Sequence, residues 1–386
     1  MEPTQGCIGR TVCLVALILA GAATPATAVI VCDSQAGFAG IQGQNNWHYG
    51  RFSTQGTPTT YAELEYFYSD DQRWQPSGET TSPFILAADA HPGWSGTYIN
   101  HSAVRQYTLQ PGQGGLLRLS GLVEHTQTGG GDGTVSRLYV NNVRVFEQRS
   151  LLTPYPYSFL ITANDGDLIR MEVGMITNPS YDSTKFTMTA ETAVGRRVVA
   201  DSRAEFCGIQ NSSPGGWQYG NYTTGNAFTS MNWSWSDSAW HGPETYQSLS
   251  AGGGHPGASY GNAVRRWTSD IDGILYLDGL LADTQTGGGN GVIGRIYRNG
   301  AELWSHTITG DGGPASAFNL TIPDAVTGDI FDFEINPNGD YGWDGTTFFA
   351  IFTVPEPASA TALAALTVTA CLARRRVRRS TSGHRP

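Results

Sequence analysis

Carboxylate side chains are the first residues of this sequence that could carry chemistry. Two acids flanking a glycosidic bond can act as general acid and base, and two pairs have suitable residue types: Glu124 with Asp132, and Asp278 with Asp283. The chain contains an internal repeat, however, and neither acid of the first pair recurs in its second half. Solvated loop charge explains these residues better, so we predict no catalytic residue.

Four other aspartates have an arrangement that suits a metal ion. Asp33 and Asp201 begin the first strand expected in each half, and Asp182 and Asp344 stand just before a late strand. If the first and last strands of a jelly roll run side by side, each pair comes together. Hard carboxylate oxygens of this kind suit Ca²⁺, which we predict as a structural ion. The alternative is that Asp182 and Asp344 cap turns.

Aromatic residues are the candidates for ligand contact, because Trp and Tyr can stack on the apolar faces of sugars. Those singled out by recurrence or by being unique to one half are Trp47, Tyr49, Trp94, Trp217, Tyr219 and Trp235. The recurring ones are equally natural as core residues, and for Trp47 and Trp217 core packing is the favoured interpretation. Trp94 and Trp235 are not shared, which favours exposure.

Histidine and cysteine form no recognisable site. His91 and His255 each precede Pro-Gly without a second metal ligand at a zinc spacing, so they fit turns. Cys32 and Cys207 are the two cysteines of the body, and a disulfide between them is possible in an oxidising compartment. No nucleophile elbow is present, and no Lys-Ser/Thr follows the glycine run as a phosphate loop requires.

The segments that must position these residues occur twice, as an internal sequence repeat. The longest match pairs Thr126-Gln-Thr-Gly-Gly-Gly-Asp-Gly with Thr284-Gln-Thr-Gly-Gly-Gly-Asn-Gly, and Trp-x-Tyr-Gly, His-Pro-Gly and Ala-Val-Arg also recur. The unit of about 160 residues is much longer than a solenoid repeat. We therefore predict two tandem copies of one domain, at 29–196 and 197–354.

Each copy has the pattern of an all-β domain. Apolar and polar residues alternate in part along 116–123, 136–140 and 273–281, and Asn141-Asn142 and Asn299-Gly300 stand where hairpin turns are needed. Glycine, with 49 residues, and an aromatic share of 11% fit short strands and tight turns. Many short strands in this length predict a jelly-roll-like β-sandwich.

Charge argues against one class of partner. The two ends hold seven of the 23 basic residues but only two of the 33 acidic ones, so the body is more acidic than the net charge of −10 suggests. Nucleic acid binding needs clusters of Lys and Arg for the phosphates, and we therefore exclude nucleic acid as a partner.

The two ends have the features of export and anchoring. Residues 1–28 combine Arg10, an apolar run and Ala26-Thr27-Ala28, which is the order of a secretory signal peptide with its cleavage site. Residues 355–386 contain Pro355-Glu356-Pro357, a largely apolar stretch of sixteen residues (358–373) and an arginine cluster that includes Arg374, Arg375 and Arg376. The apolar stretch spans roughly 24 Å as a helix, enough for a short transmembrane segment with cytoplasmic arginines.

This tail closely resembles the PEP-CTERM sorting signal of bacterial surface proteins. The resemblance covers about residues 354–379 and implies recognition by an exosortase in the inner membrane, cleavage near Pro355-Glu356-Pro357, and a final place at the cell surface or outside the cell. A plain membrane anchor would leave the topology unchanged.

The body is similar to jelly-roll modules of bacterial surface and carbohydrate-active proteins, through Val-Arg-Arg-Trp, Asp-Gly-x-Leu-x-Leu-x-Gly and Thr-Gly-Gly-Gly-Asn-Gly-Val-Ile-Gly-Arg-Ile. The resemblance implies a sandwich and an extracellular context, and less directly polysaccharide binding. The favoured hypothesis is a non-enzymatic surface or matrix protein that binds glycan. The alternatives are a polysaccharide lyase or hydrolase on the same scaffold, and a spacer without a ligand.

Overall fold

The computed structural model describes residues 27–356, except 79–82, 94–97, 99, 128, 130, 151, 212–215, 223–226, 259–260, 286–287 and 311–312. The described residues form β-strands joined by turns, with two short 3-10 turns, η1 (Gln44–Asn46) and η2 (Pro58–Thr60). None of them belongs to a helix that is long and apolar enough to span a bilayer. The predicted signal peptide and nearly all of the predicted tail lie outside the described residues.

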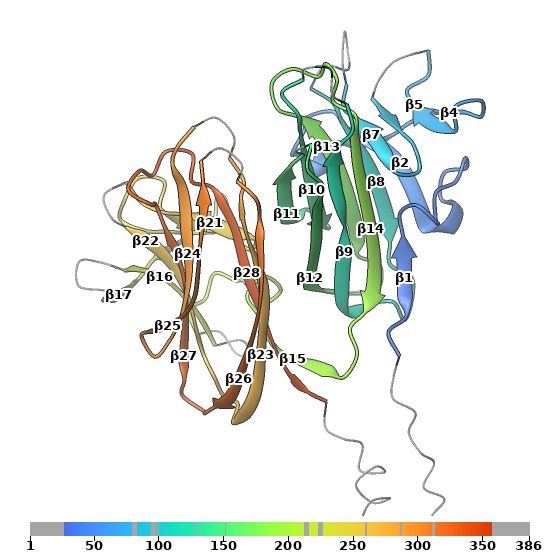
Figure 1. The fold of residues 1–386 in the computed structure, drawn as a ribbon. Helices are drawn as coiled ribbons and strands as arrows, with labels where there is room; N and C mark the ends of the chain where they lie inside the picture. The colour runs from blue at the N-terminus through green and yellow to red at the C-terminus, as the bar shows by residue number, and fades with distance from the viewer. Residues whose placement is uncertain are drawn as a thin grey trace, which may run out of the picture. The chain divides into compact units, whose positions relative to one another are not determined.

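The first β-sandwich consists of two antiparallel sheets (Figure 1). One sheet has the order β12-β9-β14-β7-β6-β5-β4 with β1 beside β14, and the other has the order β11-β10-β13-β8-β2-β3. The strands are β1 (Ile30–Asp33), β2 (Trp47–Phe52), β3 (Tyr61–Glu63), β4 (Tyr66–Tyr68), β5 (Arg73–Gln75), β6 (Phe84–Ile85), β7 (Asp89–His91), β8 (Ser102–Thr108), β9 (Gly115–His125), β10 (Thr134–Val140), β11 (Val143–Arg149), β12 (Tyr155–Ala163), β13 (Leu168–Met175) and β14 (Thr184–Thr192).

The second β-sandwich repeats this plan. Its sheets have the orders β18-β19-β20-β21-β28-β23-β26, with β15 beside β28, and β17-β16-β22-β27-β24-β25. The strands are β15 (Arg196–Asp201), β16 (Trp217–Tyr222), β17 (Phe228–Ser230), β18 (Asn232–Ser234), β19 (Ala239–His241), β20 (Ser248–Leu249), β21 (Gly253–His255), β22 (Asn262–Thr268), β23 (Gly273–Asp283), β24 (Gly291–Arg298), β25 (Ala301–Thr309), β26 (Ser316–Ala325), β27 (Ile330–Asn336) and β28 (Thr346–Pro355).

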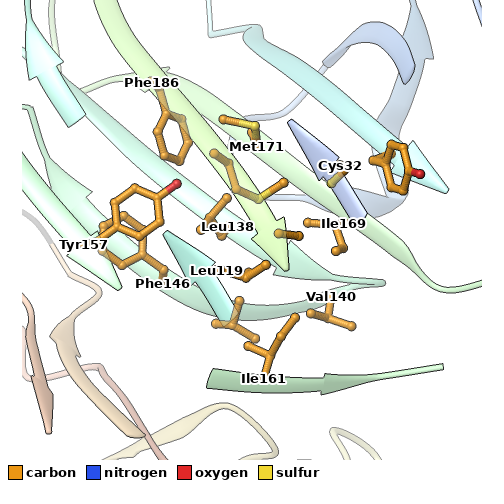
Figure 2. Close-up of a cluster of buried hydrophobic side chains, with 14 of the residues drawn as sticks. Cys32, Leu119, Leu138, Val140, Phe146, Tyr157, Ile161, Ile169, Met171 and Phe186 are labelled. Carbon is orange, nitrogen blue, oxygen red and sulfur yellow. The ribbon is translucent and has the colours of Figure 1, made fainter. Parts of the chain in front are cut away.

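Period-two alternation builds both cores. Along β14 the side chains of Phe186, Met188 and Ala190 are buried while the threonines between them are partly exposed. They pack against residues of the facing sheet such as Leu138 and Met171, as Figure 2 shows. The predicted all-β class with two sandwich domains is therefore confirmed.

A buried arginine recurs at the same place in each core. Arg105 donates from Nη1 to Phe186 O (2.8 Å) and from Nη2 to Leu86 O (2.7 Å) and Asp89 O (3.0 Å). Its counterpart Arg265 donates to backbone carbonyls including Gly253 O (2.7 Å). Burial lowers the pKa of each guanidinium to about 10. Each cation thus holds the backbone beside its last strand, a role that the sequence did not reveal.

Two sequence predictions about the strand ends have different outcomes. The first and last strands do pair in both sandwiches, β1 with β14 and β15 with β28. Cys32, in β1, and Cys207, after β15, are not joined in a disulfide. Cys32 is instead a buried core residue whose pKa burial raises to about 12.

Candidate functional site

The outer face of the six-stranded sheet in the second sandwich carries a polar groove. Its volume is about 590 Å³, within the range of small-molecule sites. Neighbouring strands β16, β22, β27 and β24 form its floor (Figure 1). The lining residues are Tyr222, Asn262, Arg266, Arg295, Tyr297, Asn299, Gly300, Ile330, Asp332, Glu334 and Asn336.

Alternation along β27 places two acids in this groove. Phe331, Phe333 and Ile335 turn into the core, so Asp332 and Glu334 must point to the opposite face. In register, Asp332 lies opposite Arg266 of β22, and Glu334 lies opposite Arg295 of β24. Opposite charges on facing strands attract, which fixes the side chains across the sheet.

Asp332 is held by three hydrogen bonds from two side chains. Arg266 donates to both of its carboxylate oxygens, from Nε at 2.7 Å and from Nη2 at 2.9 Å, and the hydroxyl of Tyr222 donates to Oδ2 at 2.6 Å. Burial, followed by this hydrogen bond, raises the pKa of Tyr222. The pairing with Asp332 raises the pKa of Arg266. The guanidinium also lies 4.1 Å above the ring of Phe228, so its orientation is set on two sides.

Glu334 is held in a similar way. Arg295 donates to it at 3.3 Å, and the amide of Asn262 donates to the same Oε1. Burial and the neighbouring Glu334 raise the pKa of Tyr297 to about 12, so its phenol keeps its proton at neutral pH. Asn336 donates to Asn262 Oδ1 at 3.1 Å and extends the network along the groove.

Such a floor matches the chemistry of hydroxyl-rich ligands. Sugar hydroxyls donate and accept, and here carboxylates, amides, phenols and guanidinium groups are fixed beside one another. Because the partners are already oriented within the protein, a ligand need not order them on binding. The groove is therefore suited to a polar ligand held by many hydrogen bonds.

The first sandwich has Arg137, Tyr139 and Glu172 where the second has Arg295, Tyr297 and Glu334. The glutamate is buried in both copies, whereas the arginine and the tyrosine are buried only in the first. The Tyr139 hydroxyl donates to Glu172 at 2.6 Å, and Arg137 bonds Glu147 at 2.6 Å and lies 3.5 Å from Glu172. Thus the core of the network recurs in both copies.

A cover accounts for this burial. The eight-residue segment between β2 and β3 lies over the network, where Gly56 N donates to Glu172 Oε1 at 2.7 Å. Phe52 contacts the rings of Tyr61 and Tyr139 to form a small apolar cluster. In the second sandwich only five residues separate β16 from β17, and Tyr222 replaces Phe52.

The predicted aromatic contacts are mostly in the cores. Trp47, Tyr49, Trp217 and Tyr219 are at most 1% exposed, so they cannot stack on a ligand, and core packing is their role. Their rings join the aromatic clusters beneath the sheets, for example Tyr219 stacked on Trp240 at 5.3 Å. Trp235 is 83% exposed, as expected, but lies outside the groove lining.

Other predicted residues fall beyond the described part of the chain. These are Trp94 and, in the sorting signal, Pro357, Arg374, Arg375 and Arg376. Pro355 ends β28 opposite Arg196, and Glu356 follows it.

The predicted pairing of aspartates is not formed. Asp33 lies opposite Thr189 and accepts from the backbone of Gln35 (2.8 Å) and Ala36 (2.9 Å), so it caps a turn. Asp201 caps the equivalent turn. The register explains the separation from Asp182, which precedes the opposite end of β14.

Asp182 and Asp344 are fully buried, and within the described part of the chain none of their carboxylate oxygens has a hydrogen-bond partner. Within the described ranges no group of three or more His, Cys, Asp or Glu side chains could hold a metal ion.

Sequence reasoning missed the groove acids. The signal was available in Ile330-Phe-Asp-Phe-Glu-Ile-Asn, where acids occupy every second position between aromatic residues. A strand with that pattern exposes its acids on one face, but the identity of the facing arginines depends on the register.

Comparisons with known proteins were made for families, curated sequences and solved structures. No family model and no curated protein matches the chain. Among solved structures it is similar to a catalytic domain with two CBM51 domains from Clostridium perfringens ZmpB, at 12% identity and a TM-score of 0.21 over 69% of this chain. The chain spans about a third of that protein, 34%.

Two further structures are carbohydrate-binding modules. Tandem CBM51 modules of a family 98 glycoside hydrolase from Streptococcus pneumoniae match 85% of this chain and 93% of that one, at 10% identity and a TM-score of 0.23. A CBM51 from Clostridium perfringens in complex with methyl-galactose matches 42% of this chain and 90% of that one, at 12% identity and a TM-score of 0.20. All three scores are below 0.5, so the description of the fold rests on the strands themselves.

Proposed function

We propose that the second sandwich binds a saccharide in the groove on its six-stranded sheet, and that the protein is a non-enzymatic component of the bacterial surface or extracellular matrix. The observation that carries the proposal is an array of partly exposed polar side chains along the groove, Arg266, Tyr222 and Arg295, which the buried carboxylates of Asp332 and Glu334 hold in place. Its donors and acceptors complement sugar hydroxyls.

The difference between the copies supports one binding site per chain. The equivalent network in the first sandwich is covered by the segment that carries Gly56 and by the cluster of Phe52 and Tyr61. The first sandwich then contributes structure, and the second contributes binding.

A glycan array probed with the purified chain tests this function. We expect selective binding to one class of polysaccharide, and isothermal titration with the best oligosaccharide should give one ligand per chain. The absence of binding to every glycan on a broad array would refute the proposal. The appearance of reducing ends or unsaturated sugars during incubation would favour the alternative of a polysaccharide hydrolase or lyase.

The location of the protein is a separate part of the proposal. The predicted signal peptide and the PEP-CTERM-like tail support export, transient anchoring in the inner membrane and processing by an exosortase. Mass spectrometry of the mature protein from its native cells should find it to begin after Ala28 and to end near Pro355. An intact C-terminus in cells that contain an exosortase would contradict the processing step.

A further inference from the structure

Two fully buried carboxylates occupy equivalent places in the sandwiches. Asp182 and Asp344 are 0% exposed, and each stands two residues before the last strand of its copy. Each follows an aromatic residue with a left-handed backbone, Tyr181 at φ 61° and Trp343 at φ 63°. All four carboxylate oxygens are unsatisfied by protein donors among the described residues. This is a repeated feature, and the saccharide groove does not use it.

The surroundings of the two aspartates are also duplicated. The residue after each aspartate donates its backbone N–H to a glutamine of the loop. Ser183 N donates to Gln127 Oε1 at 3.1 Å, and Gly345 N donates to Gln285 Oε1 at 2.8 Å. Both glutamines belong to the repeated Thr-Gln-Thr-Gly-Gly-Gly motif. The glycine-rich loop therefore lies against the segment that carries each aspartate.

Glycine is required in this loop because oxygen atoms occupy the adjacent space. A Cβ on Gly131 would lie 2.3 Å from Ser180 O and 2.9 Å from Asp182 Oδ1, and a Cβ on Gly289 would lie 2.2 Å from Gly342 O. Ser180 and Gly342 are equivalent in the repeat. In the first sandwich a backbone carbonyl and the buried carboxylate therefore come together beneath the loop, and in the second the equivalent carbonyl has the same place.

An unpaired carboxylate in a protein interior is unfavourable unless it is neutralised or binds a cation. Further negative charge makes the problem larger, since Asp132 lies near Asp182, and Asp283 and Asp340 lie near Asp344. A bound cation would relieve both the burial and the repulsion.

We propose that each sandwich binds one Ca²⁺ ion between its glycine-rich loop and the segment before its last strand, with Asp182 and Asp344 as the carboxylate ligands. Ca²⁺ accepts carboxylate, carbonyl and amide oxygens together, which is the mixture found here. Asp33 and Asp201 take no part, because they cap turns. The second site has more acids around it and binds the more tightly of the two.

The test uses the purified chain after removal of metal with EDTA. Adding Ca²⁺ should raise the melting temperature by several degrees, and Tb³⁺ should show luminescence sensitised by Trp343 and Tyr181, with two ions bound per chain. Asp182→Asn and Asp344→Asn should each remove one ion, and the double variant should lose the thermal response to Ca²⁺.

The isosteric variants also separate metal binding from simple loss of structure. In EDTA, Asp344→Asn should melt at the same temperature as the unaltered chain or higher, because it removes a buried charge. Asp33→Asn should lower the melting temperature equally with and without Ca²⁺. The proposal would be overturned if Ca²⁺ left the melting temperature of the unaltered chain unchanged, or if it raised that of the double variant as much as that of the unaltered chain.

Discussion

Tyr139 and Tyr297 occupy equivalent positions in the two sandwiches, yet only Tyr297 lines a groove. Tyr139 is 2% exposed, bonds Glu172 and lies against Phe52. Tyr297 is partly exposed beside Glu334. The glutamate is buried in both copies, at 0% exposure for Glu172 and 2% for Glu334, but the tyrosine is partly exposed only in the second copy. This contrast gives the first prediction its control.

Replacing two groove residues of the second sandwich with their counterparts from the first sandwich should weaken saccharide binding. Gln106 and Arg170 stand where the second sandwich has Arg266 and Asp332, and Arg170 donates to Gln106 at 2.7 Å. The double variant Arg266→Gln/Asp332→Arg keeps a hydrogen-bonded pair but changes the groove. We expect at least a tenfold loss of affinity in titration calorimetry, about 1.4 kcal/mol.

The reciprocal variant Gln106→Arg/Arg170→Asp is the matched control and should leave affinity unchanged. Equal binding by the groove variant and the unaltered chain would place the saccharide elsewhere.

The buried arginines should be essential for stability. Arg105→Met or Arg265→Met removes the donors to several buried carbonyls, each of which then lacks a partner. We expect each variant to lose about 3–5 kcal/mol in urea unfolding. Arg118, which is more exposed and lies 3.8 Å from Glu191, provides the comparison: Arg118→Met should change stability by less than about 0.5 kcal/mol.

Two histidines, one buried and one half-buried, should make stability fall in mild acid. His91 and His255 each donate from Nδ1 to the carbonyl of the following proline at 2.6 Å, and burial lowers the pKa of both. For His91 the neighbouring His125 lowers it further.

Because the unfolded chain binds protons more readily at these groups, their contribution is complete above about pH 6.5 and is lost as pH falls toward their folded pKa values. His91→Gln/His255→Gln should flatten the decline in unfolding free energy between about pH 6.5 and 5. Identical slopes in both proteins would exclude the histidines as the cause.

The effect of a tryptophan substitution on stability should depend on whether the side chain is buried. Trp47→Ala opens a large cavity under the sheet and should lower the free energy of unfolding by about 3–5 kcal/mol. Trp235→Ala removes an exposed ring and should change it by less than about 0.5 kcal/mol. If Trp235→Ala weakens saccharide binding, the ligand extends beyond the groove.

Sequence patterns predicted the fold well because the repeat and the alternation are local. The recurrence of Trp47 as Trp217 in the sequence repeat favoured a core position for both residues, and both are buried in the cores. The duplicated domain and the adjacent first and last strands also followed from the sequence.

The site was harder to predict because it depends on register and loop length. Asp332 faces Arg266 only through the alignment of β22 with β27. Asp33 lies opposite Thr189, near the far end of β14 from Asp182, which precedes the start of that strand. The covering of Glu172 by Gly56 depends on a contact between residues 116 positions apart, which no local pattern encodes.

The three additional residues between β2 and β3 have a consequence for the history of the molecule. In the first sandwich this segment covers Glu172, whereas the equivalent face of the second sandwich carries the polar groove. The two copies have therefore diverged at this loop, and under the proposed function only the second keeps an accessible binding face. Exchanging the two loops would reverse that assignment.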